Sequence, residues 1–416
     1  MHRGNTNTHE GQRYLGDKGL VALIAFLSVF LAMSTDLYLP ALPGMAEHFN
    51  APAKLMNLTV ILFFVFYSGG MLIWGPLSDK YGRKPILLTG LALYTGASVL
   101  CACTGDLYHL IVSRILQASG GGAATAVATA IVKDCYEGRK RETVLAAVQS
   151  MVMISPVVAP VVGAALLHFT SWRGIFWTMC GLGLVGMVGG NTLEETVGRR
   201  YEGNILQTIG RLGVVLRNPG FASLLAIFSP VSIPMMAFVV GSSYIYVNGF
   251  GLSEQVYSFY FAINALFLVV GPLIYVRLSR QWERKSIIIS CFATMAMSGF
   301  LVCMLGNLSP WILTILIIPA STSSAIIRPP STNLMLEQQR EDTGSATSLI
   351  TCFGVFMGSV GMFLISFDWS SRILALGTLQ IMIGLACGGL WLLVSGKSFV
   401  KQLPDIRRKR NEKAGH

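Results

Sequence analysis

Twelve stretches of about 20 apolar residues are the feature that most constrains what this chain can fold into. A segment of that length crosses a bilayer as a helix, because helical hydrogen bonding leaves no backbone polar group unpaired in lipid. The sequence therefore predicts an all-α membrane protein with 12 transmembrane helices. The predicted spans are residues 19–41, 55–76, 85–104, 107–133, 143–168, 173–191, 219–248, 254–276, 286–306, 310–334, 344–366 and 372–395.

The composition agrees with a membrane protein. Of the 416 residues, 12% are charged and 53% are hydrophobic, whereas soluble domains carry about 25% charged residues. A soluble enzyme, a disordered scaffold and a nucleic-acid-binding protein are therefore poor fits. The first apolar run is too long for a cleaved signal peptide, so we expect that span to be retained.

The loops between the predicted spans are short, except for one that divides the chain into two sets of six. A faint repeat accompanies this division: Gly75 and Gly271 each begin a Gly-Pro-Leu sequence at the end of a span, followed by a basic turn. Many transporters are built from such repeats. We therefore expect two pseudo-symmetric six-helix bundles. The expected parts are residues 1–191, the N-terminal bundle; 192–218, a central cytoplasmic loop; 219–396, the C-terminal bundle; and 397–416, a basic tail.

The net charge of +11 follows from the topology. Of the 31 Lys and Arg residues, 26 fall in the two terminal segments and in alternate loops, which share one side of the membrane if there are 12 spans. Basic residues gather on the cytoplasmic side. We therefore expect a multi-pass protein of the plasma membrane, the inner membrane in a bacterium, with both termini in the cytoplasm. The tail is expected to contact anionic lipid rather than nucleic acid.

Signatures of enzymes and of bound cofactors are missing from the sequence. It contains no GxxxxGK[ST] nucleotide loop, no HExxH metal motif and no nucleophile elbow, and its eight cysteines form no CxxC pair. We therefore expect no catalytic residue, no metal site, no cofactor and no use of ATP.

Two charged residues stand out within the spans. Asp36 is the one carboxylate placed inside a predicted span, and Arg114 lies at a similar depth, about 11 Å from the outer end of span four against about 7 Å for Asp36 in span one. Charged groups inside a bilayer pair with one another or line water. A buried carboxyl that takes up a proton on one side and releases it on the other suits a proton-coupled carrier. The alternative for Asp36 is a helix cap near Pro40 and Pro43.

Arg114 and Gln117 lie one helical turn apart, on the same face of span four. We expect them to take part in a cavity together with Asp36; the alternative is a static tie between helices. Arg328 is a third charge within a span, before two consecutive prolines, and has no predicted partner.

Five segments resemble the major facilitator superfamily. GPLSDKYGRKP, beginning at Gly75, resembles the family's loop signature, and the run from Arg114 to Gly122 resembles the fourth-helix motif RxxQGxG, with Ala118 in place of its first Gly. SPVVAPVVGA, beginning at Ser155, partly matches the fifth-helix antiporter motif. SWRGIF, beginning at Ser171, resembles the entry to helix six, and STDLYLPALP, beginning at Ser34, looks like the first helix of the Bcr/CflA-type 12-span drug:proton antiporters.

The resemblance implies a function as well as a fold. It implies alternating access between two bundles and export of small amphipathic drugs or toxic compounds in exchange for protons, with Asp36, Arg114 and Gln117 in proton coupling or substrate binding. One alternative is a narrow exporter of a metabolite or sugar; another is a membrane receptor that binds without transporting. The expected partners are a small-molecule substrate, protons and the bilayer, and the expected state is a monomer.

The resemblance also assigns mechanical roles. The loop after span two is expected to act as a latch between the halves, with Asp79 at the N-terminus of another helix and Arg83 paired with Asp134; the alternative is a plain topology signal. Its residues are Gly75, Asp79, Gly82, Arg83 and Asp134, where the glycines are expected to allow close packing and a tight turn.

The helix-five motif is expected to bend the helix and to pack closely against a neighbour, which would prevent a proton leak; the alternative is ordinary membrane-helix proline. Its residues are Pro156, Pro160 and Gly163. The glycines at 120–122 are likewise expected to allow close helix approach. Aromatic and amide side chains within the spans are candidates to line a cavity: Tyr38, Phe64, Tyr67, Tyr257, Tyr260, Asn264 and Asn333.

Overall fold

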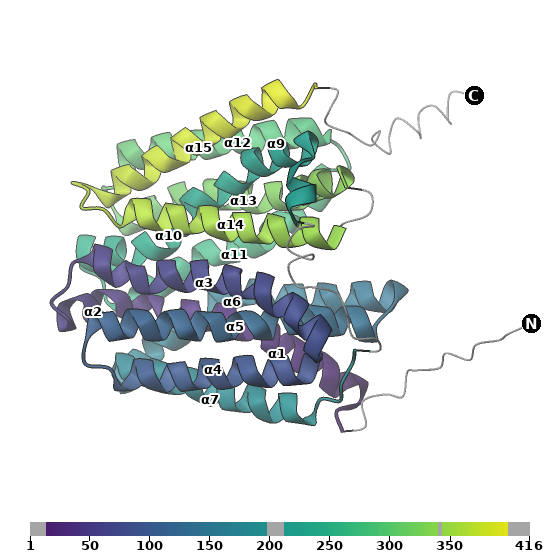
Figure 1. Ribbon diagram of the computed structural model, residues 1–416. Coiled ribbons are helices and arrows are strands. Elements are labelled where there is room, and N and C mark those ends of the chain that lie inside the picture. Colours follow the sequence, from purple (N-terminus) through teal and green to yellow (C-terminus); the bar gives the residue numbers. More distant parts are fainter. Residues whose placement is uncertain (1–13, 198–211, 340–342, 398–416) are drawn as a thin grey trace, which may run out of the picture. The chain divides into compact units, whose positions relative to one another are not determined.

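The computed structural model describes residues 14–197, 212–339 and 343–397 (Figure 1). The chain forms two compact units, Met1–Ile205 and Leu206–His416, which are called here the N-terminal and C-terminal units. Within the described residues every secondary-structure element is a helix. Twelve helical segments in the described residues are long and apolar enough to cross a membrane, six in each unit. The predicted all-α fold with 12 membrane-spanning helices is confirmed.

The N-terminal unit is built from six long segments with short connections. Helix α3 packs on α5, α5 on α4, and α4 on α7, while α1 packs on α6 (Figure 1). Small residues allow these contacts: a Cβ at Gly120 would meet the α4 backbone at Gly90 and Tyr94, and a Cβ at Gly122 would meet the α3 backbone. The close approach expected at these glycines is confirmed. The elements are α1 (Gly16–Asp36), η1 (Leu39–Ala41), α2 (Leu42–His48), α3 (Ala53–Tyr81), α4 (Arg83–Cys103), α5 (Leu107–Cys135), α6 (Gly138–Phe169) and α7 (Trp172–Thr192).

The first membrane-spanning segment is a broken helix. Helix α1 ends at Asp36, the 3-10 turn η1 follows, and α2 continues to His48. Pro40 and Pro43 cause the break, because neither has the N–H that would bond to the carbonyl four residues earlier. The whole segment spans Gly16–His48, so the expected end at residue 41 falls seven residues short.

The C-terminal unit repeats the packing order of the N-terminal unit. Here α11 packs on α13, α13 on α12, α12 on α15, and α10 on α14. Counted along the chain, these are the same pairings of second with fourth, third with fourth, third with sixth and first with fifth segment. The expected internal repeat is therefore visible in the packing. The elements are α9 (Pro219–Phe228), η2 (Ser229–Val231), α10 (Ser232–Ser243), the π-helical turn η3 (Tyr244–Gly249), α11 (Glu254–Leu278), α12 (Arg284–Leu305), α13 (Pro310–Glu337), α14 (Thr343–Ile365) and α15 (Arg372–Val394).

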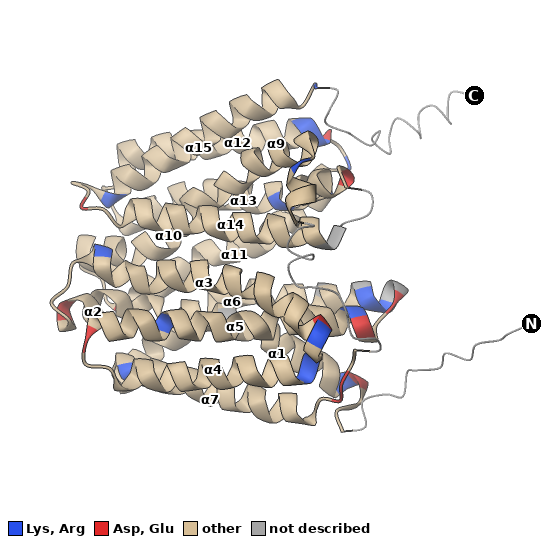
Figure 2. Ribbon diagram, viewed as in Figure 1, with Lys and Arg blue, Asp and Glu red and all other residues tan. Residues whose placement is uncertain are grey.

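The surfaces of both units are those of a membrane protein. Charged residues gather at the ends of the helices within each unit (Figure 2). Large apolar side chains are exposed along the helices between those ends, for example Leu385 of α15 at 64% and Met297 of α12 at 60%. Such surfaces are unfavourable in water and suited to contact with lipid.

Candidate functional site

Arg114 is completely buried inside the N-terminal unit, near the start of α5. Its Nη1 donates a hydrogen bond to Oε1 of Gln117 at 2.6 Å. The guanidinium carbon lies 4.2 Å from the ring centre of Phe63, 4.8 Å from that of Tyr38 and 5.8 Å from that of Phe176. Aromatic faces attract a cation and replace part of the hydration that it loses on burial. The site is therefore an aromatic cage around a buried cation.

Gln117 connects this cage to two further helices. Its Nε2 donates to Oγ of Ser98 at 2.7 Å, and that hydroxyl donates to the carbonyl of Tyr94 at 2.8 Å. The hydroxyls of Tyr94 and Ser34 are also hydrogen-bonded. The network links α1, α4 and α5, and it fixes the orientation of the Gln117 amide, since Oε1 accepts and Nε2 donates.

Arg114 keeps unused hydrogen-bonding capacity. Its Nε and Nη2 are buried and have no hydrogen-bond partner among the described residues. A buried donor without an acceptor costs free energy, and a guanidinium has five N–H groups to satisfy. The site can therefore accept an oxygen atom from water or from a bound molecule.

Asp36 is buried at the end of α1, with 8% of the residue exposed. Its Oδ1 accepts a 3.5 Å contact from Oγ1 of Thr35. Helix α1 ends at this residue, so the alternative that Asp36 lies at a helix end stays open beside a role in proton coupling.

Within the described residues Asp36 and Arg114 make no ion pair with one another, and the expectation that both take part in one cavity stays a prediction. Tyr38, which follows Asp36 in the break, lies against the guanidinium instead, and its hydroxyl is hydrogen-bonded to Oγ1 of Thr59 at 3.0 Å. Asp36 and Arg114 are therefore connected through the turn that carries Tyr38.

The helix-five motif lies on α6, which is the fifth membrane-spanning helix, and it packs on the turn that follows Asp36. A Cβ at Gly163 of α6 would overlap the carbonyl oxygen of Leu37, the residue after Asp36. Close packing at Gly163 is thus confirmed, while α6 stays one continuous helix through Pro156 and Pro160. In the C-terminal unit, Gly361 of α14 makes the same kind of contact with the backbone of Ile233.

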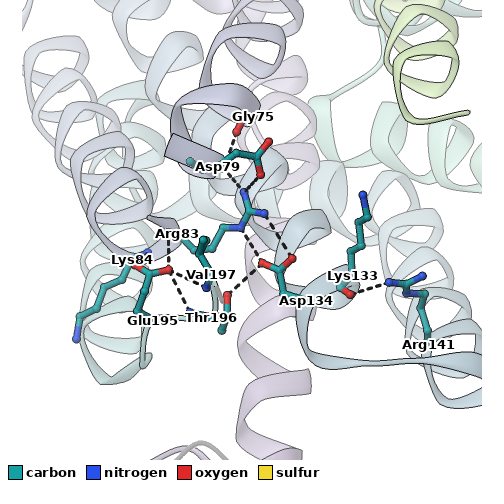
Figure 3. Close-up of polar contacts among 11 residues, drawn as sticks. Gly75, Asp79, Arg83, Lys84, Lys133, Asp134, Arg141, Glu195, Thr196 and Val197 are labelled. Atoms are coloured by element: carbon teal, nitrogen blue, oxygen red, sulfur yellow. Dashed lines mark hydrogen bonds and ion pairs between the residues drawn. The ribbon is translucent and has the colours of Figure 1, made fainter. Parts of the chain in front are cut away.

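The predicted ion pair between Arg83 and Asp134 is present (Figure 3). Arg83 Nε lies 2.8 Å from Oδ2 of Asp134, and Nη1 lies 2.6 Å from Oδ1 of Asp79 and donates to Oγ of Ser78 at 2.6 Å. The Arg83 side chain is 7% exposed and that of Asp134 19%. One guanidinium therefore joins the end of α3 and the start of α4 to the end of α5.

At the start of α4 the capping acceptor is Glu195, and the expected place of Asp79 at the N-terminus of another helix stays a prediction. Oε1 of Glu195 accepts from the backbone N–H of Arg83 at 2.8 Å, and Oε2 accepts from that of Lys84 at 3.3 Å (Figure 3). Gly82 makes the approach possible: its φ is +107°, and a Cβ there would overlap the Glu195 carboxylate. Asp79 contacts the Arg83 side chain.

Gly75 does not make the close contact that was expected. A Cβ there would meet no atom within 4 Å among the described residues, whereas a Cβ at its counterpart Gly271 would meet Ala325 and the carbonyl of Thr322. The C-terminal unit also has its own version of the ion pair: Arg284 Nη1 lies 3.0 Å from Oε1 and 3.1 Å from Oε2 of Glu337.

The expected cavity residues of the N-terminal unit fall around the Arg114 cage. Tyr38 lies on the guanidinium, and Tyr67 packs with Phe63 and Ala118. Phe64 contacts the edge of Phe63 and is only partly buried. The residue on the guanidinium is thus Phe63, one position from the predicted Phe64.

The expected cavity residues of the C-terminal unit do not gather at one point. Tyr257 and Tyr260 are buried and pack with Tyr246, while Asn264 is buried with Nδ2 unpartnered among the described residues. Asn333 and Arg328 are exposed on α13.

This architecture defines a class of protein, a helical multi-pass membrane protein with a charged network buried in its spans. The sequence profile of the Major Facilitator Superfamily matches residues 24–362, and the chain therefore belongs to that family of membrane transporters, which are not enzymes.

Curated relatives agree with the family. The chain is 28% identical over 350 residues to the uncharacterized MFS-type transporter YdgK of Bacillus subtilis, covering 82% of this chain and 87% of that protein. It is 30% identical over 283 residues to the multidrug resistance protein MdtM of Salmonella typhimurium, covering 66% and 67%. It is 27% identical over 394 residues to the chloramphenicol resistance protein of Pseudomonas aeruginosa, covering 88% and 90%.

Solved structures show the same fold. A D-xylose-proton symporter superposes with a TM-score of 0.72 at 14% identity, covering 93% of this chain and 98% of that chain. The peptide transporter POT in complex with sulfate gives 0.72 at 15% identity, covering 94% and 98%. At these identities the likeness concerns the fold alone.

Proposed function

We propose that this transporter is a proton-coupled antiporter that exports small amphipathic compounds by alternating access of its two units. The observation that carries the proposal is Asp36, a carboxyl group buried in a broken membrane helix without a cation partner among the described residues. An acid in that setting is stable when protonated and costly when ionised. Asp36 is therefore the group suited to load and release a proton.

The broken helix supplies a way to link that proton to movement. Asp36 and Tyr38 lie on the same turn, and Tyr38 touches the Arg114 guanidinium. A change in the charge of Asp36 alters the electrostatic potential at that turn and at the Arg114 guanidinium, which Tyr38 contacts. We infer that protonation of Asp36 and binding of substrate compete through this turn, as exchange of a proton for a substrate requires.

The Arg114 cage supports the proposed substrate class. Phe63, Tyr38 and Phe176 provide apolar and aromatic surface, and two nitrogens of Arg114, Nε and Nη2, have no hydrogen-bond partner among the described residues. A compound with an apolar body and an oxygen acceptor suits this combination. Relatives named for multidrug and chloramphenicol resistance support export of such compounds, in the manner of the Bcr/CflA group that the first span resembles.

The remaining parts of the proposal concern topology. We propose that both termini lie in the cytoplasm, that the membrane is the plasma membrane, the inner membrane in a bacterium, and that the protein acts as a monomer. The division into residues 1–191, 192–218, 219–396 and 397–416 stays part of this proposal. The tail and most of the central loop lie outside the described residues.

Uptake into inside-out membrane vesicles tests Asp36. With the wild type, an imposed proton gradient should drive accumulation of a lipophilic compound, and Asp36→Asn should abolish it, because an amide cannot exchange a proton. Asp368→Asn, at an exposed acid between α14 and α15, is the matched control and should transport normally. Gradient-driven accumulation by Asp36→Asn would refute Asp36 as the coupling site.

A substrate panel separates the alternatives. Reconstituted protein supplied with lipophilic cations, neutral antibiotics and sugars should transport several chemically unrelated amphipathic compounds. Transport of one metabolite or sugar alone would establish a narrow exporter, and binding without transport would establish a receptor.

A further inference from the structure

A groove of about 620 Å³ opens on the N-terminal unit where α4 ends and α5 begins. It lies at the opposite end of α4 from Arg83 and its ion pairs. Its apolar part includes Leu100, Val112 and Leu116, and its polar part includes Thr104, Asp106 and His109. The transport mechanism proposed above uses none of these residues.

The apolar part of the groove has the character of a lipid-facing surface. Leu100 is 53% exposed, Val112 56% and Leu116 38%, and the last two are four residues apart on α5, hence on one face. Tyr108, at the first turn of α5, is 68% exposed, and tyrosine is enriched where membrane helices meet the headgroups. The groove therefore runs from headgroup depth into acyl-chain depth.

The carboxylate of Asp106 lies at the polar end of the groove. Oδ2 of Asp106 accepts from the backbone N–H of Tyr108 at 3.0 Å and of His109 at 3.1 Å, and it contacts His109 Nδ1 at 3.1 Å. Oδ1 of Asp106 has no partner among the described residues. The backbone N–H of His109 is the main cause that lowers the pKa of the Asp106 carboxyl. Asp106 is therefore an ionised acceptor at neutral pH.

A cation borders the same end of the groove. Nη2 of Arg173 donates to the backbone carbonyl of Thr104 at 3.1 Å, and its guanidinium carbon lies 4.2 Å from the ring centre of Trp172. The groove thus has the Asp106 carboxylate in its lining, the Arg173 guanidinium beside Thr104 at its border, and an apolar channel next to them. This order of charges complements a headgroup that carries both a phosphate and an ammonium.

We propose that this groove binds one bilayer phospholipid with a primary ammonium headgroup. The ammonium contacts Asp106 Oδ1, the phosphate lies toward Arg173, and one acyl chain lies along Leu100, Val112 and Leu116. A quaternary ammonium has no N–H to donate to the carboxylate, and an anionic headgroup without an amine is repelled by it. The site therefore discriminates between lipids by the amine.

Native mass spectrometry of the purified full chain tests this. The protein is equilibrated with equal parts of phosphatidylethanolamine, phosphatidylcholine and phosphatidylglycerol, and the first retained lipid is identified. The wild type should retain phosphatidylethanolamine over phosphatidylcholine by about two- to fivefold, the range that an exposed ion pair contributes. Asp106→Asn should bring that ratio close to one, while Asn still caps α5.

Two further variants make the outcome decisive. Arg173→Gln should reduce retention of all three lipids, because each has a phosphate, and should leave the ratio between the first two unchanged. Asp368→Asn, a charge-matched control in the C-terminal unit, should behave as the wild type. The proposal is overturned if Asp106→Asn keeps the wild-type ratio of phosphatidylethanolamine to phosphatidylcholine. It is also overturned if the wild type retains these two lipids equally, or if it prefers phosphatidylglycerol.

Discussion

Gly163 of α6 packs directly against the backbone of Leu37, the residue that follows Asp36. The turn between α1 and η1 departs from helical hydrogen bonding, since the Tyr38 N–H bonds to Thr35, three residues back, and Pro40 has no N–H to donate. Its position therefore depends on what packs against it. A residue without a side chain on α6 lets the two backbones touch, and in this way the helix-five motif supports the turn of the proposed coupling acid.

Gly163→Ala should impair both folding and transport. The added methyl would overlap the Leu37 carbonyl, and overpacking of this kind costs about 1–3 kcal/mol. Alanine otherwise favours a helix by about 0.5–1 kcal/mol over glycine, so the steric cost wins. Gly181→Ala on α7 is the control, because a Cβ there meets no atom within 4 Å among the described residues. Equal thermal unfolding of the two variants would show that the contact is unimportant.

Arg83→Ala should be more damaging than Arg284→Ala, although both remove an ion-paired arginine at a helix end. Arg83 is 7% exposed and serves two carboxylates, whereas Arg284 is 31% exposed and serves one. Breaking a buried pair costs about 3–5 kcal/mol, and exposed pairs contribute about 0–1 kcal/mol. Thermal unfolding of the purified variants measures the difference, and the reverse order would contradict the account.

Glu195→Ala should lower the stability of the N-terminal unit by about 1 kcal/mol, the usual loss when a capping acceptor is removed. The two N–H groups at the start of α4 would lose their acceptor. Glu195→Gln keeps an oxygen and should lose less. Glu47→Ala, at an exposed acid near the end of α2, serves as the control. A loss in the control equal to that in Glu195→Ala would mean that capping is not the cause.

Phe63→Leu should weaken substrate export more than Phe64→Leu. Of these two phenylalanines, Phe63 is the one with its ring on the Arg114 guanidinium, at 4.2 Å. Losing such a contact in a desolvated site costs about 2 kcal/mol, or roughly thirtyfold in an equilibrium constant, while leucine still fills most of the space. Concentration-dependent uptake by reconstituted vesicles compares the two, and equal effects would argue against a role for the aromatic cage.

Features set by local sequence were predicted well. Twelve apolar runs gave the spans. The ion pair of Arg83 with Asp134, 51 residues apart, was expected because both residues were placed at helix ends on one side of the membrane. The family profile confirms the superfamily that the motifs suggested.

Features that depend on packing over long sequence distances were missed. Glu195 lies 112 residues from Arg83 in the chain. The sequence shows only that an acidic residue follows the sixth span, which does not predict that it caps α4. Which of Phe63 and Phe64 faces Arg114 depends on the rotation of α3. The similar depth of Asp36 and Arg114 likewise gave no sign that Tyr38 lies on the guanidinium.

The most direct test is proton release from the purified protein on addition of a transported compound, followed with a pH indicator in weak buffer. We expect the wild type to release protons, Asp36→Asn to release none while still binding the compound, and Arg114→Ala to bind it poorly. Proton release by Asp36→Asn equal to that of the wild type would contradict the central claim that Asp36 is the coupling acid.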